Sequence, residues 1–295
     1  MRRIKYRISL ENISMDFMIA VTMIVITVIT FYPFVYILFY SLSKSSAIGT
    51  RLLSWPRSFN LDAYALMIRN ISQIPRAFFI SLSRTVLGSF LSILVTSIGA
   101  YVFSRKELLF RSFLTKYVAI TMYFSSGMIP TYILMQTLRL SGTFWVYIIP
   151  SLFSVFNMPL IRTYIESLPE GLQESAVIDG ANEYVLFFRI VLPVIIPVIA
   201  AVPLFSCVGH WNSYSDTLLY NAEKKELHTL QYVLMVFVQT STASLEQARR
   251  MEKINAINSS TLKMALTIVT VIPILCIYPA LQKHFASGIL IGSII

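Results

Sequence analysis

The stretch Glu174-Ser175-Ala176-Val177-Ile178-Asp179-Gly180 is followed, after nine residues, by Ile190-Val191-Leu192-Pro193, and strongly apolar sequence lies on both sides. Upstream, Ser167 and Glu170 have the spacing of a capping box, in which each side chain satisfies a backbone amide of the other residue. We therefore expect a helix to begin near Leu168.

The same stretch also contains the signals that end this helix and start another. Gly180 can adopt the left-handed backbone conformation that closes a helix without a side-chain clash. Asn182 is a suitable cap for a second, largely apolar helix that runs toward Pro193. The sequence thus predicts two short helices that meet at a bend.

The composition is that of an integral membrane protein. Of 295 residues 56% are hydrophobic, and the mean hydropathy is +0.70. Several apolar runs approach the roughly 20 residues that a helix needs to cross a bilayer, and none alternates like a membrane barrel strand. We expect one all-α permease-type domain over residues 1–295, with six transmembrane helices at about 16–42, 78–103, 113–130, 143–161, 192–208 and 262–281. Polar connectors are expected at 43–77, 166–191 and 209–260.

Charge and cysteine content argue against several other classes of protein. The formal charge of +10 comes from Lys and Arg at the ends of apolar runs, which favours lipid headgroups over nucleic acid as partner. Cys207 and Cys276 belong to no CxxC or Cys/His cluster, so neither a metal site nor a disulfide is predicted. The sequence contains no phosphate-binding loop and no Ser/His/Asp arrangement. We therefore expect no catalytic residue and no cofactor.

The spacing of the opening stretch resembles that of a known family. Glu174-x-Ala176, then Gly180, then Ile190-x-Leu192-Pro193 is similar to the cytoplasmic EAA loop of the membrane subunits of type I ABC importers. The flanking residues resemble the maltose-permease-like branch, which imports sugars. Ser175 stands where the family usually has alanine, and it is small enough to preserve close packing.

The resemblance extends over nearly the whole chain. It includes the connector before the second span, the end of that span, the end of the third span and the residues after the fifth, as well as two segments similar to the oligosaccharide and polysaccharide-fragment subgroup. These motifs are Asn60-Leu61-x-x-Tyr64, Ala100-Tyr101, Gly127-x-x-Pro130, Trp211-Asn212, Leu230-Gln231 and Asn258-Ser259-Ser260-Thr261-Leu262-Lys263-Met264-Ala265.

The resemblance implies a transport subunit and not an enzyme. Such a subunit translocates a carbohydrate into the cell by ATP-driven alternating access, with both termini cytoplasmic and 166–191 as the cytoplasmic loop. It pairs with a second homologous permease, two cytoplasmic ATPase subunits and an external sugar-binding protein. The positions that match the ATPase-coupling motif are Glu174, Ser175, Ala176, Gly180, Ile190, Leu192 and Pro193.

Within this loop the carboxylate of Glu174 is expected to face a basic group of the ATPase, whereas Asp179 and Glu183 are expected to face solvent. Lys and Arg are nearly balanced between the two sides, so the positive-inside rule does not fix the orientation. The cytoplasmic termini are therefore an inference from the resemblance alone.

An ion-coupled secondary carrier is the alternative. Such a carrier would need ionisable residues at mid-membrane, and the deep spans here are nearly free of Asp, Glu and Lys. Arg84, in the second span, could line a sugar path, although snorkelling to the outer interface is the favoured interpretation. Trp211 and Asn212 could contact sugar, or Trp211 could be an interfacial anchor, and the sequence leaves both open.

Overall fold

The computed structural model describes residues 10–43, 59–69, 71, 73–124, 126–201, 203–239 and 259–292. Two compact units divide the chain. Unit 1 contains Met1–Met67 and Ser241–Val269, and unit 2 contains Ile68–Thr240 and Thr270–Ile295. The regular elements of the described residues are helical, and α14 (Ser259–Gly292) belongs in part to each unit.

Unit 1 contains α1 (Leu10–Ser41) and most of α2 (Asp62–Arg69). Most side chains of α1 are apolar and exposed, as expected of a helix that faces lipid, and Pro33 lies inside the helix. The hydroxyl groups of Ser41 and Tyr64 are 2.7 Å apart and join the end of α1 to α2. The expected first span, 16–42, thus coincides with most of α1.

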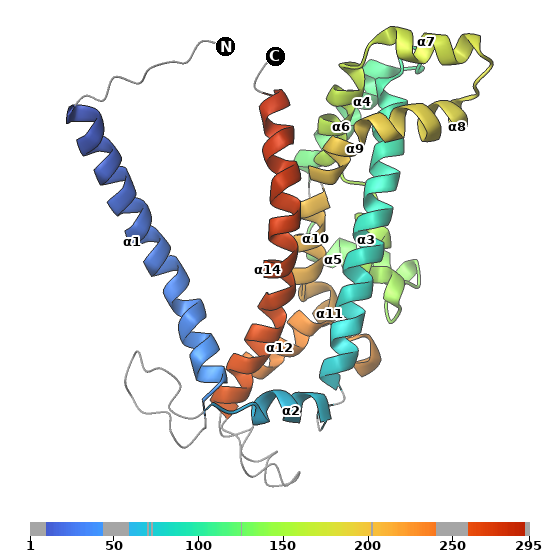
Figure 1. The fold of residues 1–295 in the computed structure, drawn as a ribbon. Helices are drawn as coiled ribbons and strands as arrows, with labels where there is room; N and C mark the ends of the chain where they lie inside the picture. Colours follow the sequence, from blue (N-terminus) through green and yellow to red (C-terminus); the bar gives the residue numbers. More distant parts are fainter. Residues whose placement is uncertain are drawn as a thin grey trace. The chain divides into compact units, whose positions relative to one another are not determined.

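The scaffold of unit 2 is α3 (Gln73–Ser104), which covers the expected second span. In Figure 1 the helices α6 (Asn157–Glu166) and α10 (Pro203–Asn212) pack beside it. The buried positions of α3 are mostly Ala, Gly, Ser and Thr, including Ser81, Gly88 and Ala100. Small residues allow helices to approach closely in a membrane, where the lipid provides no hydrophobic drive for association.

Gly88 marks the tightest contact between α3 and α10. A β-carbon there would lie 2.7 Å from Cε1 and 2.8 Å from Nε2 of the buried His210 ring. Overpacking of this kind costs about 1–3 kcal/mol. We therefore expect Gly88→Ala to lower the thermal midpoint of the solubilised complex, whereas Ser89→Ala, at a neighbouring buried position whose hydroxyl has no hydrogen-bond partner among the described residues, should not. Equal midpoints for the two variants would contradict this packing.

The third predicted span, 113–130, is not one straight helix. The chain forms α4 (Arg111–Tyr123) and α5 (Met128–Thr137), which are bent by 114° relative to each other. Gly127 precedes α5 with a φ of +81°, a conformation that glycine adopts without strain. The helix α5 therefore starts directly after Gly127 and continues beyond residue 130, where the span was predicted to end.

The prediction of a single helix over 143–161 is wrong. The segment contains two short 3₁₀ helices, η2 (Phe144–Tyr147) and η3 (Ile149–Ser151), and only then α6. Pro150 cannot donate to a helical ladder. The amide of Ser154 donates instead to Thr96 Oγ1, and the amide of Asn157 donates to Ser154 Oγ. The apolar composition suggested a span, but polar side chains accept backbone N–H groups that a continuous helix would pair within itself.

The later part of the chain contains α9 (Leu192–Ala201) and α10 where the fifth span was predicted, and α14 contains the sixth, 262–281. The expected loop 209–260 contains α11 (Ser215–Tyr220), η5 (Lys225–Leu227) and α12 (Leu230–Gln239), and its residues 240–258 lie outside the described ranges. Within the described residues, three helices are long and apolar enough to span a membrane, or four if α4 and α5 form one span. The count of six stays a prediction.

Candidate functional site

The segment 166–191, here called the EAA segment, forms α7 (Glu170–Ile178), α8 (Glu183–Val185) and η4 (Leu186–Val191), which is a π-helix. Figure 1 shows α7 and α8 near α4, at the end of unit 2 where α3 finishes. The predicted cap at Ser167 is wrong. Because α6 continues to Glu166, Ser167 ends that helix, and its hydroxyl donates to the Tyr164 carbonyl. Pro169 precedes α7 instead.

The bend has the predicted geometry. Gly180 has a φ of +83°, and its amide donates to the Val177 carbonyl while the Ala181 amide donates to the Ala176 carbonyl. These two bonds form a Schellman motif, which satisfies the last carbonyls of a helix. Asn182 caps α8, because its side-chain oxygen accepts the Val185 amide at 2.9 Å. Both of these local predictions are confirmed.

Apolar contacts join the EAA segment to the body of unit 2. Ala176 is buried on the inner face of α7, and Leu186, Phe187 and Val191 are buried on the π-helix. They pack in one cluster with side chains of α3, α6 and α9, including Tyr101. A π-helix is uncommon and occurs often at functional sites. Here it connects α8 directly to α9, so the segment is continuous with an apolar helix of unit 2.

Polar contacts hold the same segment from the side. Arg105, directly after α3, donates to Gln173 Oε1 at 2.9 Å and to Glu183 Oε1 at 3.1 Å. Tyr101 donates its hydroxyl hydrogen to the other oxygen of Glu183. The Glu183 side chain is 61% exposed, as expected, yet it is also the residue that fixes α8 to α3. Spacing along the sequence gives no sign of this role, because the partners of Glu183 lie about 80 residues earlier in the chain.

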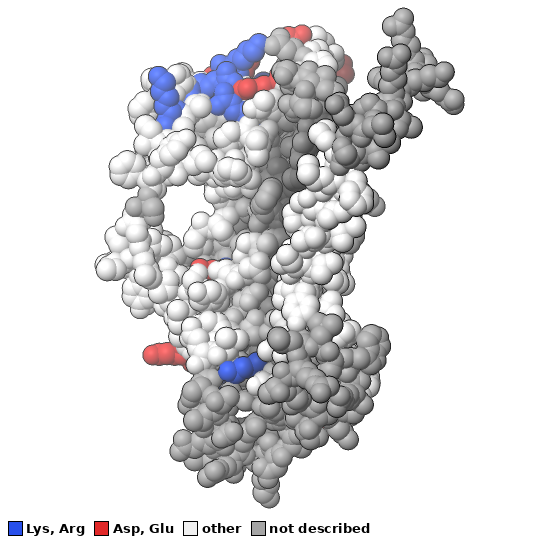
Figure 2. Space-filling model, turned by 90° about the vertical axis from the view of Figure 1, so that its left-hand side faces the viewer, with Lys and Arg blue, Asp and Glu red and all other residues white. Residues whose placement is uncertain are grey.

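Further ion pairs brace this end of unit 2. Glu166, at the end of α6, accepts hydrogen bonds from Arg111 of α4 and from Arg162, the latter at 2.8 Å. Figure 2 shows Lys and Arg side chains gathered with Asp and Glu at one end of the visible face, and a broad uncharged surface next to them. Charged side chains next to a broad uncharged surface are typical of a protein that meets the membrane interface at that end.

The seven motif residues divide between an outer and an inner face. Glu174, Ser175, Gly180 and Pro193 are exposed, Ala176 is buried, and Ile190 and Leu192 are half-buried against the core cluster. Exposed apolar side chains accompany the outer set, and Ile178 is 84% exposed. The others are Leu172, Val177 and Tyr184. Exposed apolar groups next to polar ones are typical of a protein contact surface.

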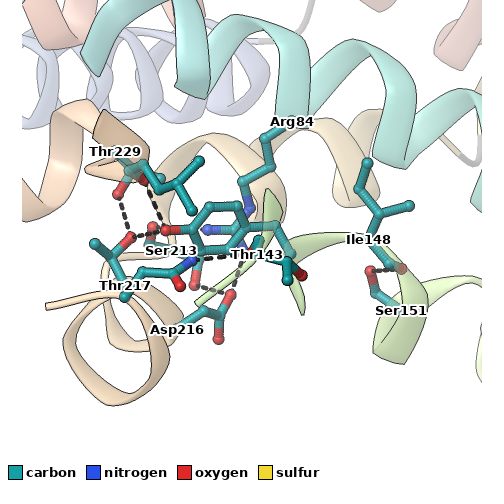
Figure 3. Close-up of polar contacts among 11 residues, drawn as sticks. Arg84, Thr143, Ile148, Ser151, Ser213, Asp216, Thr217 and Thr229 are labelled. Atoms are coloured by element: carbon teal, nitrogen blue, oxygen red, sulfur yellow. Dashed lines mark hydrogen bonds and ion pairs between the residues drawn. The ribbon is translucent and has the colours of Figure 1, made fainter. Parts of the chain in front are cut away.

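A second candidate site is a half-open cavity of about 500 Å³ in unit 2, bordered by α3, α5, the 3₁₀ helices, α10 and α11. Arg84 of α3 lines it and is only 3% exposed. Its Nη2 forms an ion pair with Asp216, its Nη1 donates to the Ser213 carbonyl, and its guanidinium carbon lies 4.7 Å from the centre of the Tyr147 ring (Figure 3). The snorkelling interpretation of Arg84 is therefore wrong.

Hydrogen bonds hold the partners of Arg84 in place. Ser213 Oγ donates to the same oxygen of Asp216 at 2.9 Å. The Tyr147 hydroxyl lies 3.1 Å from Thr217 Oγ1 and donates to the Leu227 carbonyl. Thr217 in turn contacts Thr229 at 2.9 Å, so α11, the start of α12 and the 3₁₀ region form one network (Figure 3).

The surroundings of Trp211 fit neither a sugar contact nor an interfacial anchor. The side chain is 3% exposed, its indole N–H donates to the Thr270 carbonyl at 3.0 Å, and its ring meets the edge of Phe78. A tryptophan so enclosed is a packing residue of unit 2. Asn212 is exposed and accepts a hydrogen bond from Gln231. Among the described residues, no group of three or more His, Cys, Asp or Glu side chains is arranged to hold a metal ion.

Comparison with known proteins gives close relatives over almost the full length. The polygalacturonan/rhamnogalacturonan transport system permease protein YtcP of Bacillus subtilis is 33% identical over 286 residues, which cover 97% of this chain and 99% of that protein. Protein LplC of the same organism is 36% identical over 268 residues, 90% of each chain. The arabinooligosaccharides transport system permease protein AraQ of Halalkalibacterium halodurans is 24% identical over 83% of each chain.

A solved structure is similar in fold. A chain from the crystal structure of a bacterial ABC transporter involved in the import of the acidic polysaccharide alginate matches with a TM-score of 0.84 and 25% identity, and the match covers 95% of this chain and 99% of that one. No family model matches the sequence.

Proposed function

Since this chain belongs to the permease subunits of ABC carbohydrate importers, we propose that it moves an oligosaccharide or a polysaccharide fragment through the bilayer and couples to ATPases through α7. The chain is a transport component of the membrane and not an enzyme. Permeases of this family work with a partner permease, ATPases and a substrate-binding protein. Two of the relatives named above are named for the transport of polygalacturonan/rhamnogalacturonan and of arabinooligosaccharides, and the solved structure for the import of alginate, which supports an oligomeric or polymeric sugar as the substrate.

The coupling proposal is supported by one observation: the EAA segment is packed against unit 2 on its inner face and exposed on its outer face. Its inner face is packed into the core of unit 2 and tied by Arg105 and Glu183, whereas its outer face exposes Glu174 and apolar side chains such as Ile178. A rigid element held on one side and open on the other can transmit a movement to the helices attached to it. The motif residues of α7 and the bend at Gly180 would form this contact.

We also propose that the end of unit 2 that bears the EAA segment faces the cytoplasm, together with both chain termini. This orientation rests on the resemblance of the EAA segment to a cytoplasmic loop, because Lys and Arg are nearly balanced between the two sides of the chain. The opposite end of unit 2, with α11 and α12, would then face the external sugar-binding protein. Two copies of the ATPase, one under each permease, would complete the importer.

Reconstitution tests the proposed function directly. Proteoliposomes that contain this chain, its partner permease and the ATPases should take up an oligosaccharide only when ATP and the binding protein are both present. Uptake should continue after ionophores collapse the proton and sodium gradients, because ATP closure of the ATPases supplies the drive. Uptake that stops with the gradients and survives without the ATPases would instead identify an ion-coupled carrier.

A further inference from the structure

The cavity of unit 2 has the size and lining of a saccharide site. Its volume of about 500 Å³ lies within the roughly 300–1,000 Å³ of typical ligand pockets. Its walls combine aromatic rings, Tyr147 and Tyr220, with many hydroxyl groups. The Ser and Thr residues that line it are Ser92, Thr131, Ser151, Ser154, Ser206 and Ser213.

The ion pair in the wall of the cavity has hydrogen-bonding capacity that the protein does not use. A guanidinium has five N–H groups, and Arg84 makes two hydrogen bonds, to Asp216 and to the Ser213 carbonyl. Arg84 Nε has no partner among the described residues but is enclosed by protein, so the unused donors that a ligand could meet are the second N–H groups of the two Nη atoms. Both hydrogen bonds that the described residues make to the Asp216 carboxylate end on Oδ2, so Oδ1 accepts none within the described part of the chain. Donors and an acceptor therefore remain together at one place (Figure 3).

The formal charge of the cavity lining is balanced. Among the described residues that line it, Arg84 is the single Lys or Arg and Asp216 the single Asp or Glu. A sugar carboxylate bound here would place a second negative charge beside Asp216, and the one positive charge, on Arg84, is already paired with Asp216. Sugar hydroxyl groups both donate and accept, so they match the unused donors of Arg84 and the free oxygen of Asp216 without adding charge.

We propose that this cavity is a saccharide subsite of the permease itself, in which Arg84 and Asp216 hydrogen-bond the hydroxyl groups of an uncharged sugar unit. The inference rests on the carbohydrate import proposed above and adds the chemical class of the unit bound in this subunit. Asp216 is then the residue that sets specificity, because its charge excludes carboxylates. Tyr147 holds the guanidinium in place from its ring face.

The test measures binding of two trisaccharides, galactotriose and trigalacturonate, which differ only in the group at C6. The solubilised permease–ATPase complex is used without the binding protein, so that the specificity of the latter does not contribute, and binding is followed by ligand-observed NMR. We expect the wild type to bind galactotriose at least about tenfold more tightly, because trigalacturonate brings uncompensated charge.

Two substitutions at one position separate charge from shape. Asp216→Asn removes the negative charge and keeps an oxygen acceptor, so we expect the preference to shift toward trigalacturonate by about tenfold or more. Asp216→Glu keeps the charge and should keep the preference for galactotriose. Ser89→Ala, which lies on α3 outside the cavity lining, is the matched control and should leave both affinities unchanged.

The possible results of these binding measurements distinguish failure of the saccharide subsite from failure of the proposed import function, on which the subsite rests. Equal binding of the two trisaccharides by the wild type, a preference for trigalacturonate, or binding of neither would overturn the subsite, and the wild-type ratio decides this even if Asp216→Asn fails to assemble. The proposed function stands in those cases if saccharide and binding protein still stimulate ATP hydrolysis. Absence of any stimulated hydrolysis would overturn the function itself.

Discussion

Replacing Gly180 by valine is expected to reduce carbohydrate-stimulated ATP hydrolysis at least about tenfold in the reconstituted importer. Gly180 has a φ of +83° at the end of α7, a conformation that costs a β-branched residue about 1–3 kcal/mol. The valine side chain would have free space around it, since no atom lies within 4 Å of a β-carbon built there. The damage therefore comes from unwinding the Schellman bend and from added bulk on the outer face of the EAA segment.

Two further glycine variants make this prediction specific. Gly171 is also exposed in α7 with open space around it, but it has ordinary helical geometry. Gly171→Ala should therefore preserve coupling and stabilise the helix by about 0.5–1 kcal/mol. Gly180→Asn tolerates the left-handed conformation and should retain more activity than valine does. Copurification of ATPase subunits and stimulated hydrolysis are the measurements, and full activity of Gly180→Val would refute the role of the bend.

Loss of Arg84 should produce the largest change in stability. Arg84→Met leaves Asp216 without its counter-ion inside unit 2, and breaking a buried pair in this way costs about 3–5 kcal/mol. The double variant Arg84→Met with Asp216→Leu should recover most of this loss, because no unpaired charge then remains. The exposure of Asp216, 32% for its side chain, places the expected cost nearer the lower value.

Denaturant titration of the solubilised complex, followed by the fluorescence of the buried Trp211, measures this difference. The expected order of midpoints is wild type, then the double variant, then Arg84→Met. Ser89→Ala on the same helix serves as the control for a substitution on α3 that leaves the pair intact. If Arg84→Met and the double variant were equally destabilised, the cost would come from lost packing of the long side chain and not from the unpaired charge.

Local features of the chain followed from the sequence because their causes are local. Gly180 closes α7 and Asn182 caps α8 through contacts within five residues, which spacing alone predicts. The long apolar runs of the sequence predicted α1, α3 and the part of α14 that is long and apolar enough to span a membrane. This works because a helix satisfies its own backbone hydrogen bonds and an apolar surface is stable in contact with lipid.

Only the tertiary structure decided how polar groups are paired inside unit 2. Arg84 and Asp216 are 132 residues apart, and Glu183 lies 78 residues from Arg105 and 82 from Tyr101, so no sequence period links them. The same cause explains why the prediction of one helix over 143–161 is wrong: the amide of Ser154 donates its hydrogen bond to the hydroxyl of Thr96, a distant residue on α3. Composition and spacing determine which segments are helical and apolar. A buried charge or amide must be paired, and its partner is the group that the packed helices bring within hydrogen-bonding distance, so the partner is fixed only when the chain is folded.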